Sequence, residues 1–252
     1  MLQKTVIILV GHGSDNKESN LQFEEIAYEL RQRFRPALLI HAYLEKAKPS
    51  FEDVLFEMSR TFKDIVVFPM LLFNATHSRN DIPGIVDKVL AQQSNVNIEI
   101  MPVIGPDPIM CDIVIDRCAE SDHFLEKKSD KASIIVAGRG ASHKEALKEF
   151  NDFLSYFNDY HHLHEISGGF ISLAQPDLTS SIKQQIQNGL DTFYIFPYLF
   201  YGGYLLTKLN KLVGSLQEEH PDLTFITLSP IGNHEHLIAL IEKRVISWLS
   251  SY

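Results

Sequence analysis

The chain has 252 residues, of which 45% are hydrophobic and 22% charged, as in a globular protein with one large core or two small ones. No apolar run approaches the ~18 residues of a membrane helix, and no small-residue cleavage site follows the apolar N-terminal stretch, so we expect a cytoplasmic protein without membrane contact. The net charge is −9, which argues against a nucleic-acid partner.

The first half of the chain alternates apolar runs with amphipathic stretches. The apolar runs predict strands that are covered on both faces, at residues 5–10, 37–44, 65–73 and 97–103. The amphipathic stretches predict helices at residues 18–34, 50–62, 81–93 and 107–120, with Ser50 and Asp81 as candidate N-caps. Cys111 and Cys118 lie on the last of these helices, and we expect both to be buried thiols.

The second half of the chain repeats the first. Four segments recur in the same order at an offset of 127 or 128: residues 7–14 and 134–141, 42–50 and 169–177, 65–73 and 193–201, 103–105 and 230–232. The sequence therefore predicts an α/β protein of two tandem similar domains, each a four-stranded parallel sheet flanked by helices, with a cleft between them. We place the domains at residues 1–124 and 128–252, joined by the polar stretch 120–133.

Three potential metal ligands follow the first three predicted strands. His12, Glu45 and His77 each come directly after an apolar run. The carboxyl ends of parallel strands meet at one edge of a sheet, which is where α/β proteins bind ligands. A single histidine after a strand is more often a loop residue, but three ligand types at successive strand ends favour a site. Two imidazoles and a carboxylate suit cobalt, nickel, iron or zinc.

The second copy retains the glycines and prolines of the first and loses these three residues. In their places, in order, the alignment puts Arg139, Ser172 and Leu205. The same edge instead offers cationic, aromatic and hydroxyl side chains: Arg139, Ser142, Tyr201, Tyr204 and Lys208. Such an edge would suit a large, flat polyanion.

Five segments together resemble the sirohydrochlorin chelatases of the class II chelatase superfamily, in their long two-domain form: LVGHGSDNKESN, AYLEKAKPS, FPMLLFNATHSRNDIP, AGRGAS and FPYLFYGGYL. The resemblance implies a lyase that inserts Co²⁺, Fe²⁺ or Ni²⁺ into a tetrapyrrole during cobalamin or siroheme synthesis. The metal would be a substrate, and no permanently bound cofactor is implied. His12 and His77 would bind the metal and accept protons, with Glu45 assisting them.

The tetrapyrrole substrate implied by this resemblance, sirohydrochlorin, carries several carboxylates. Charged and hydrogen-bonding side chains at the strand ends are candidates to receive them: Ser14, Arg79, Arg139, Ser142, Tyr204 and Lys208. For Lys208, a role as an ordinary surface charge is equally favoured.

Two other functions fit part of the pattern. A histidine phosphatase would use a strand-end histidine, but it needs an arginine beside that residue, and glycines flank His12. A two-lobed carrier could bind metal or tetrapyrrole without turnover. We expect the chain to be a monomer.

The remaining histidines are interpreted as structural. We expect His161, His162 and His164 to occupy a solvated loop, although such a cluster could bind metal. His234 and His236 are expected to cap the last helix, and His41 is expected to pack within a strand.

Overall fold

The computed structural model describes residues 5–35, 37–74, 77–93, 95–121, 131–160 and 165–250. The chain forms two compact units, Met1–Gly105 with Ile238–Tyr252, and Pro106–Leu237. The first unit thus combines the N-terminal and C-terminal segments of the chain.

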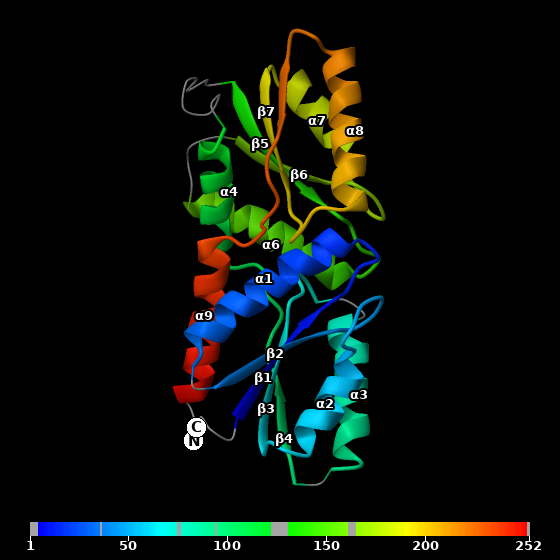
Figure 1. Ribbon diagram of the computed structural model, residues 1–252. Helices are drawn as coiled ribbons and strands as arrows, with labels where there is room; N and C mark the ends of the chain where they lie inside the picture. The colour runs from blue at the N-terminus through cyan, green and yellow to red at the C-terminus, as the bar shows by residue number, and fades with distance from the viewer. Residues whose placement is uncertain are drawn as a thin grey trace. The chain divides into compact units, whose positions relative to one another are not determined.

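The first unit is a four-stranded parallel sheet covered by helices on both faces. Its elements in chain order are β1 (Thr5–Gly11), α1 (Lys17–Arg33), β2 (Leu38–Tyr43), α2 (Phe51–Ser59), β3 (Asp64–Pro69), the π-helical turn η2 (His77–Asp81), α3 (Ile82–Leu90), β4 (Asn97–Ile100) and α9 (Glu235–Ser250). The strand order is β2-β1-β3-β4. Helices α1 and α9 lie on one face of this sheet, and α2 and α3 lie on the other (Figure 1).

The second unit has the same architecture. Its elements are α4 (Ile109–Ala119), β5 (Ala132–Gly138), α6 (Lys144–Tyr160), β6 (Glu165–Phe170), α7 (Leu178–Gln187), β7 (Thr192–Pro197), α8 (Tyr204–Glu219) and β8 (Thr224–Thr227). The strands are parallel in the order β6-β5-β7-β8. Two sheets of identical order confirm the predicted α/β repeat.

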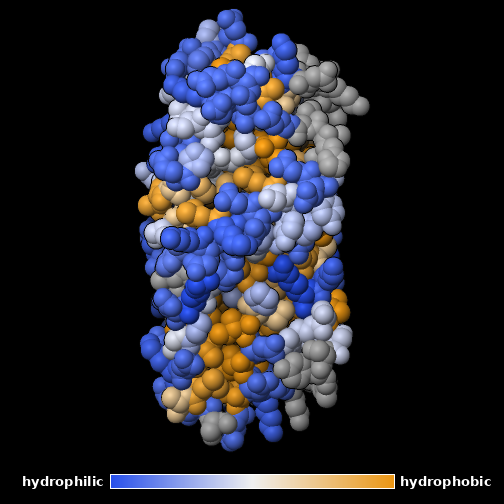
Figure 2. Space-filling view, turned by 180° about the vertical axis from the view of Figure 1, so that it is seen from behind, coloured by the Kyte–Doolittle hydropathy of each residue, from blue (hydrophilic) through white to orange (hydrophobic). Residues whose placement is uncertain are grey.

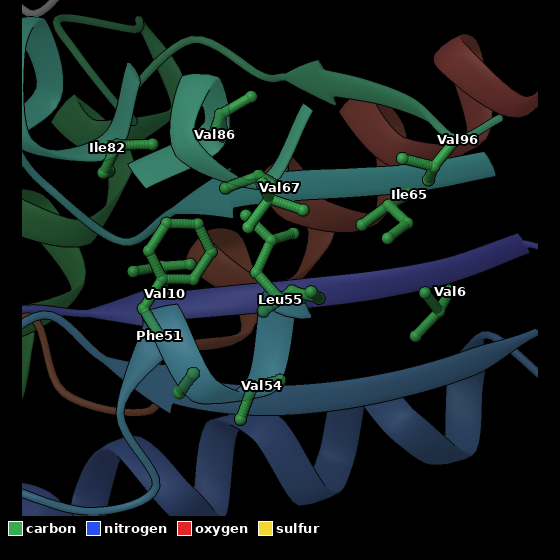
Figure 3. Close-up of a cluster of buried hydrophobic side chains, with 13 residues drawn as sticks. Val6, Val10, Phe51, Val54, Leu55, Ile65, Val67, Ile82, Val86 and Val96 are labelled. Atoms are coloured by element: carbon green, nitrogen blue, oxygen red, sulfur yellow. The ribbon is translucent and has the colours of Figure 1, made fainter. Parts of the chain in front are cut away.

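The centre of the first sheet is buried on both faces, as its uniformly apolar sequence predicted. All seven residues of β1 are buried. Val6, Ile8 and Val10 belong to a cluster with side chains of α2 and α3, which Figure 3 shows in close-up. The alternate residues Ile7 and Leu9 are also fully buried and point to the opposite face of the strand. Covering both faces leaves only the ends of the strands open to a ligand.

The helix that ends each repeat belongs to the compact unit of the other repeat. Helix α4 falls within the second unit, whereas most of α9 falls within the first. Two equivalent arginines illustrate the exchange. Arg117 donates hydrogen bonds to the carbonyl oxygens of Pro230 and Ile231 at 3.0 and 2.8 Å. Arg244 donates to those of Val103 and Ile104, both at 2.8 Å.

This exchange separates the compact units from the sequence repeats. The predicted domains, residues 1–124 and 128–252, follow the internal repetition. The compact units instead divide near residues 105 and 237. Local sequence periodicity cannot show which sheet a terminal helix packs on, because the helix pattern is the same in both cases.

Other expectations from the sequence can be checked locally. The Ser50 hydroxyl accepts a hydrogen bond from the Asp53 amide, which confirms Ser50 as the N-cap of α2. Cys111 and Cys118 are buried free thiols, as expected, and burial raises the pKa of each to about 12.

The surface alternates hydrophilic and hydrophobic patches over the face shown in Figure 2. Among the described residues, no helix combines the length and the apolar character needed to span a membrane.

Candidate metal centre

The loop after β1 fixes the orientation of His12. The His12 Nδ1 lies 2.9 Å from the carbonyl oxygen of Gly13. Because a carbonyl oxygen can only accept a hydrogen bond, Nδ1 carries the proton, and the lone pair of the neutral ring lies on Nε2. The loop thus presents Nε2 as the ligand atom.

The loop after β2 is joined to this first loop by backbone hydrogen bonds. The Leu44 amide donates to Gly11 and the Glu45 amide donates to His12, at 2.9 and 3.0 Å. Gly13 has φ of 87°, and a methyl group at this position would overlap the carbonyl oxygen of Glu45. A glycine is therefore required for Glu45 to lie beside His12.

His77 reaches the same place from the π-helical turn that follows β3. Its Nδ1 donates a hydrogen bond to Asp81 Oδ2 at 2.7 Å, which again leaves Nε2 as the available lone pair. Asp81 occupies the N-cap position of α3, as expected, but without a side-chain cap. The Asp81 side chain makes no capping bond, because its backbone is already helical and its carboxylate is directed to His77.

His12, Glu45 and His77 converge as predicted. One ligand atom from each lies within 4.8 Å of the others, and no other group of three histidine, cysteine or acidic residues meets this criterion in the described parts of the chain. His12 Nε2 lies 3.4 Å from Glu45 Oε1. The two imidazole rings meet edge to face with centroids 4.6 Å apart.

The three side chains are only partly buried. The exposed fractions are 33% for His12, 44% for Glu45 and 31% for His77. An ion held here could therefore exchange its ligands with solvent or with a second molecule, whereas a structural metal site is closed. Two nitrogen atoms and one oxygen atom suit a first-row divalent transition metal.

The other candidates of the first unit differ in their surroundings. Ser14 is engaged locally: its amide and carbonyl are both bound by the Asn20 side chain, and its hydroxyl accepts from the Asn16 amide. Asn16, which the sequence analysis did not single out, caps α1. Arg79 is exposed within the π-helical turn, two residues after His77.

The framework of the site recurs in the second unit without the ligands. The Ile171 and Ser172 amides donate to Gly138 and Arg139, as Leu44 and Glu45 do to their partners. Gly140 has φ of 88°, and a methyl group there would overlap the Ser172 carbonyl oxygen. The loop geometry therefore persists in a unit in which arginine and serine replace histidine and glutamate.

The substrate-binding candidates of the second unit all lie at the strand ends of that unit. Arg139 and Ser142 are exposed in the loop after β5. Tyr204 begins α8 and is 80% exposed. Lys208 donates a hydrogen bond to the Ile171 carbonyl oxygen at 2.9 Å, which favours a local role for this side chain.

The remaining histidines lie outside the metal centre where the structure describes them. His41 packs near the rings of Phe23 and Tyr43, as expected, and burial lowers its pKa. His234 Nδ1 accepts from the His236 amide at the start of α9, which confirms the capping role for His234. The His236 ring instead stacks on that of His234. His161, His162 and His164 lie outside the described residues.

The sequence profile of the CbiX family matches residues 6–121 and 133–247, which together are most of the chain. The chain belongs to the CbiX family. The two matches coincide with the two repeats, and the family membership confirms the resemblance seen in the sequence.

Individual proteins extend this CbiX likeness over the whole chain. The sirohydrochlorin cobaltochelatase of Priestia megaterium is 23% identical over 240 residues, 94% of this chain and 78% of that protein. The sirohydrochlorin ferrochelatase of the same organism is 24% identical over 248 residues, 97% of this chain and 91% of that protein. The structure of SirB from Bacillus subtilis with Fe³⁺ has the same fold, with a TM-score of 0.85, 23% identity and coverage of 97% of this chain and 95% of that one.

Proposed function

We propose that this CbiX-family chain is a sirohydrochlorin chelatase, which inserts Co²⁺ or Fe²⁺ into the tetrapyrrole for cobalamin or siroheme synthesis. The observation that carries the proposal is the convergence of His12, Glu45 and His77 within 4.8 Å at partly exposed strand ends. The names of the relatives, cobaltochelatase and ferrochelatase, support the same reaction class.

The reaction exchanges one divalent ion for two protons. The ion must lose its bound water, and the two pyrrole N–H groups of the macrocycle must give up their protons. The tetrapyrrole then holds the ion through its four nitrogens. A protein site for this reaction has to bind the ion well enough to replace water, yet release it to the ring.

The two histidines can serve both steps in succession. A neutral imidazole has one lone pair, so Nε2 either ligates the ion or accepts a proton. As ring nitrogens replace His12 and His77 on the ion, each Nε2 becomes free to accept a pyrrole proton. Glu45, the most exposed of the three side chains, can hold the ion through one oxygen and pass protons to solvent through the other.

Binding of the substrate carboxylates is assigned to exposed strand-end groups. We propose Arg139 and Ser142 in the second unit, and Arg79 in the first, as the principal groups. Tyr204 adds an exposed ring for the macrocycle face. Ser14 and Lys208 are weaker candidates, since both already make local hydrogen bonds.

An arginine that contacts substrate equally in the ground and transition states should affect KM more than kcat. We therefore expect Arg139→Ala to raise the KM for sirohydrochlorin by about tenfold, with a smaller change in kcat. Lys148→Ala is a matched control, because it removes a cation of the same unit that pairs with Asp152 on the surface. An unchanged KM in Arg139→Ala would assign this residue a structural role.

The reaction itself is tested by anaerobic incubation of the protein with sirohydrochlorin and Co²⁺, Fe²⁺ or Ni²⁺ separately, following the tetrapyrrole absorption spectrum. Multiple turnovers under substrate excess are expected with at least one metal. A single stoichiometric conversion would instead indicate a carrier. A phosphatase is disfavoured because Glu45 would set a carboxylate against any phosphoryl group on His12 Nε2, 3.4 Å away.

A further inference from the structure

The two units differ by one residue between the third strand and the helix that follows it. Pro69 and Pro197 occupy the same position, each paired with the central strand of its sheet. The buried residues of α3 are Ile82, Val86 and Val89, and those of α8 are Leu209, Val213 and Leu216, with identical spacing. Proline to first buried helical residue spans 13 positions in the first unit (69 to 82) and 12 in the second (197 to 209).

A π-helical turn is a second difference between the two units. Such a turn accommodates one more residue than an α-helical turn and is frequent at functional sites. In the first unit, η2 spans His77–Asp81 and runs directly into α3. In the second unit, α8 begins at Tyr204 as an ordinary α-helix. From the first helical residue to the first buried one, both units span five positions, 77 to 82 and 204 to 209, so the surplus residue lies between Pro69 and His77.

The change of offset alters which residue of the second unit corresponds to His77. Alignment through the strand sets His77 opposite Leu205, whereas alignment through the buried helical residues sets it opposite Tyr204. The same alignment sets Asp81 opposite Lys208. The Lys208 ammonium group is directed to a backbone carbonyl, so the second unit has no counterpart of the carboxylate–imidazole pair at these positions.

The pair has a direct consequence for the ligand atom of His77. Asp81 Oδ2 accepts the Nδ1 proton at 2.7 Å, which fixes both the tautomer and the direction of the ring. Without this acceptor, the ring could turn about its side-chain bonds or carry its proton on Nε2, and either change would remove a ligand from the centre. His12 obtains the same constraint from a backbone carbonyl, whereas His77 depends on a side chain.

We propose that Asp81, at the end of the π-helical turn, is a positioning residue for His77 at the candidate metal centre. The proposal rests on the proposed function, since it concerns the same site. Hydrogen-bond partners of metal-binding histidines commonly contribute a factor of about 10–100 to metal affinity.

The test measures Co²⁺ binding to the full-length protein without tetrapyrrole, by calorimetry and by the visible absorption of bound Co²⁺. We expect Asp81→Ala to raise the Kd for Co²⁺ by about 10–100-fold. Asp81→Asn keeps an oxygen acceptor for Nδ1 and should recover a large part of the affinity, a rescue that a purely structural role of Asp81 would not produce. Thermal unfolding should show all variants to be folded.

Two further variants make the outcome decisive. Glu52→Gln removes one negative charge at an exposed ion pair with Lys88 and serves as the control for net charge. A wild-type Kd in Asp81→Ala, or an equal loss of affinity in Glu52→Gln, would overturn the positioning role. In His77→Ala, Asp81→Ala should cause no additional loss. Wild-type Co²⁺ binding in His77→Ala alone would instead contradict the proposed metal centre itself.

Discussion

His12 and His77 use their ring nitrogens in the same way. Each engages Nδ1 with a nearby oxygen, a carbonyl for His12 and the Asp81 carboxylate for His77, and each keeps the lone pair of Nε2 available for a ligand. Neither residue belongs to the buried core, so its loss should leave the fold intact. At the scale of single residues, the two histidines can therefore be substituted without unfolding the protein.

We expect His12→Ala or His77→Ala to reduce chelatase turnover by at least about 100-fold, because each removes one of three ligands and one proton acceptor. Turnover would be measured spectrophotometrically with saturating metal and sirohydrochlorin. His236→Ala is the matched control, since this histidine lies in the other unit and stacks on His234. Near-wild-type rates in both variants would exclude the two histidines from the reaction.

Gly13 supports the centre through its backbone alone. We expect Gly13→Ala to destabilise the protein by about 2 kcal/mol or more, since its φ is positive and the added methyl group would overlap the Glu45 carbonyl. Gly84→Ala, at an exposed helical position with open space around it, should be neutral or stabilising by up to about 1 kcal/mol. Urea unfolding of both variants provides the comparison. Equal stabilities would show that the Gly13 loop can move to admit a side chain.

At the scale of elements, the second unit shows which features of the loops persist when the three candidate ligands are absent. Lys46 and Leu173 adopt positive φ at equivalent positions after β2 and β6, and the loop hydrogen bonds recur. These features are therefore properties of the fold. The π-helical turn does not recur before α8, and it accompanies the histidine and its carboxylate. The difference assigns the loop geometry to the scaffold and the π-helical turn to the candidate site.

Deletion of Asn80 should convert the π-helical turn into an α-helical one, because it removes one exposed residue from the turn and leaves 12 positions between Pro69 and the first buried helical residue, as in the second unit. The second unit shows that the shorter connection is compatible with the fold, so we expect a melting temperature within a few degrees of wild type. The turn of His77 away from Asp81 should raise the Kd for Co²⁺ by at least about tenfold. Asn80→Ala, which keeps the length, should bind as wild type does. Undiminished binding after the deletion would show that the turn is dispensable.

At the scale of the whole molecule, each compact unit is completed by a distant part of the sequence. The first unit takes residues 238–252, and within α9 Ile238, Ile241 and Val245 are buried. The equivalent arginines, Arg117 and Arg244, bind carbonyl pairs of equivalent segments. Stability of the first unit thus depends on a helix that follows it by more than 130 residues in the sequence.

A fragment of residues 1–121 therefore lacks α9, which covers its sheet in the full chain. It retains α4, which belongs to the other compact unit. We expect this fragment to self-associate, with α4 of one copy replacing α9 on the other and Arg117 making the Arg244 hydrogen bonds. Sedimentation velocity over a range of concentrations would measure the association. Arg117→Ala in the fragment should weaken it by about tenfold, whereas Lys88→Ala serves as a surface control. A folded, monomeric fragment would contradict the dependence on α9.

The candidate site was predictable to different degrees for its different members. His12 and Glu45 follow strands with clear apolar patterns, and parallel topology alone brings them together. His77 was found by the same argument, but the role of Asp81 was not, because an aspartate next to an Ile-Pro pair reads as a helix cap. The sequence does signal a length difference between the repeats near His77, visible as the change of offset from 128 to 127.

The sequence by itself determined the class of fold, the duplication, the positions of the strands and the three candidate metal ligands, because each depends on patterns within a few neighbouring residues. The tertiary structure decided which helix covers which sheet and where the His77 ring is directed. Both depend on contacts between segments that are distant in the sequence. The helical periodicity of α4 and α9 does not show which sheet each helix covers. A shift of one residue turns a helical side chain by about 100° around the helix axis. These contacts are fixed by the packing of buried side chains against the sheets, which local sequence patterns do not specify.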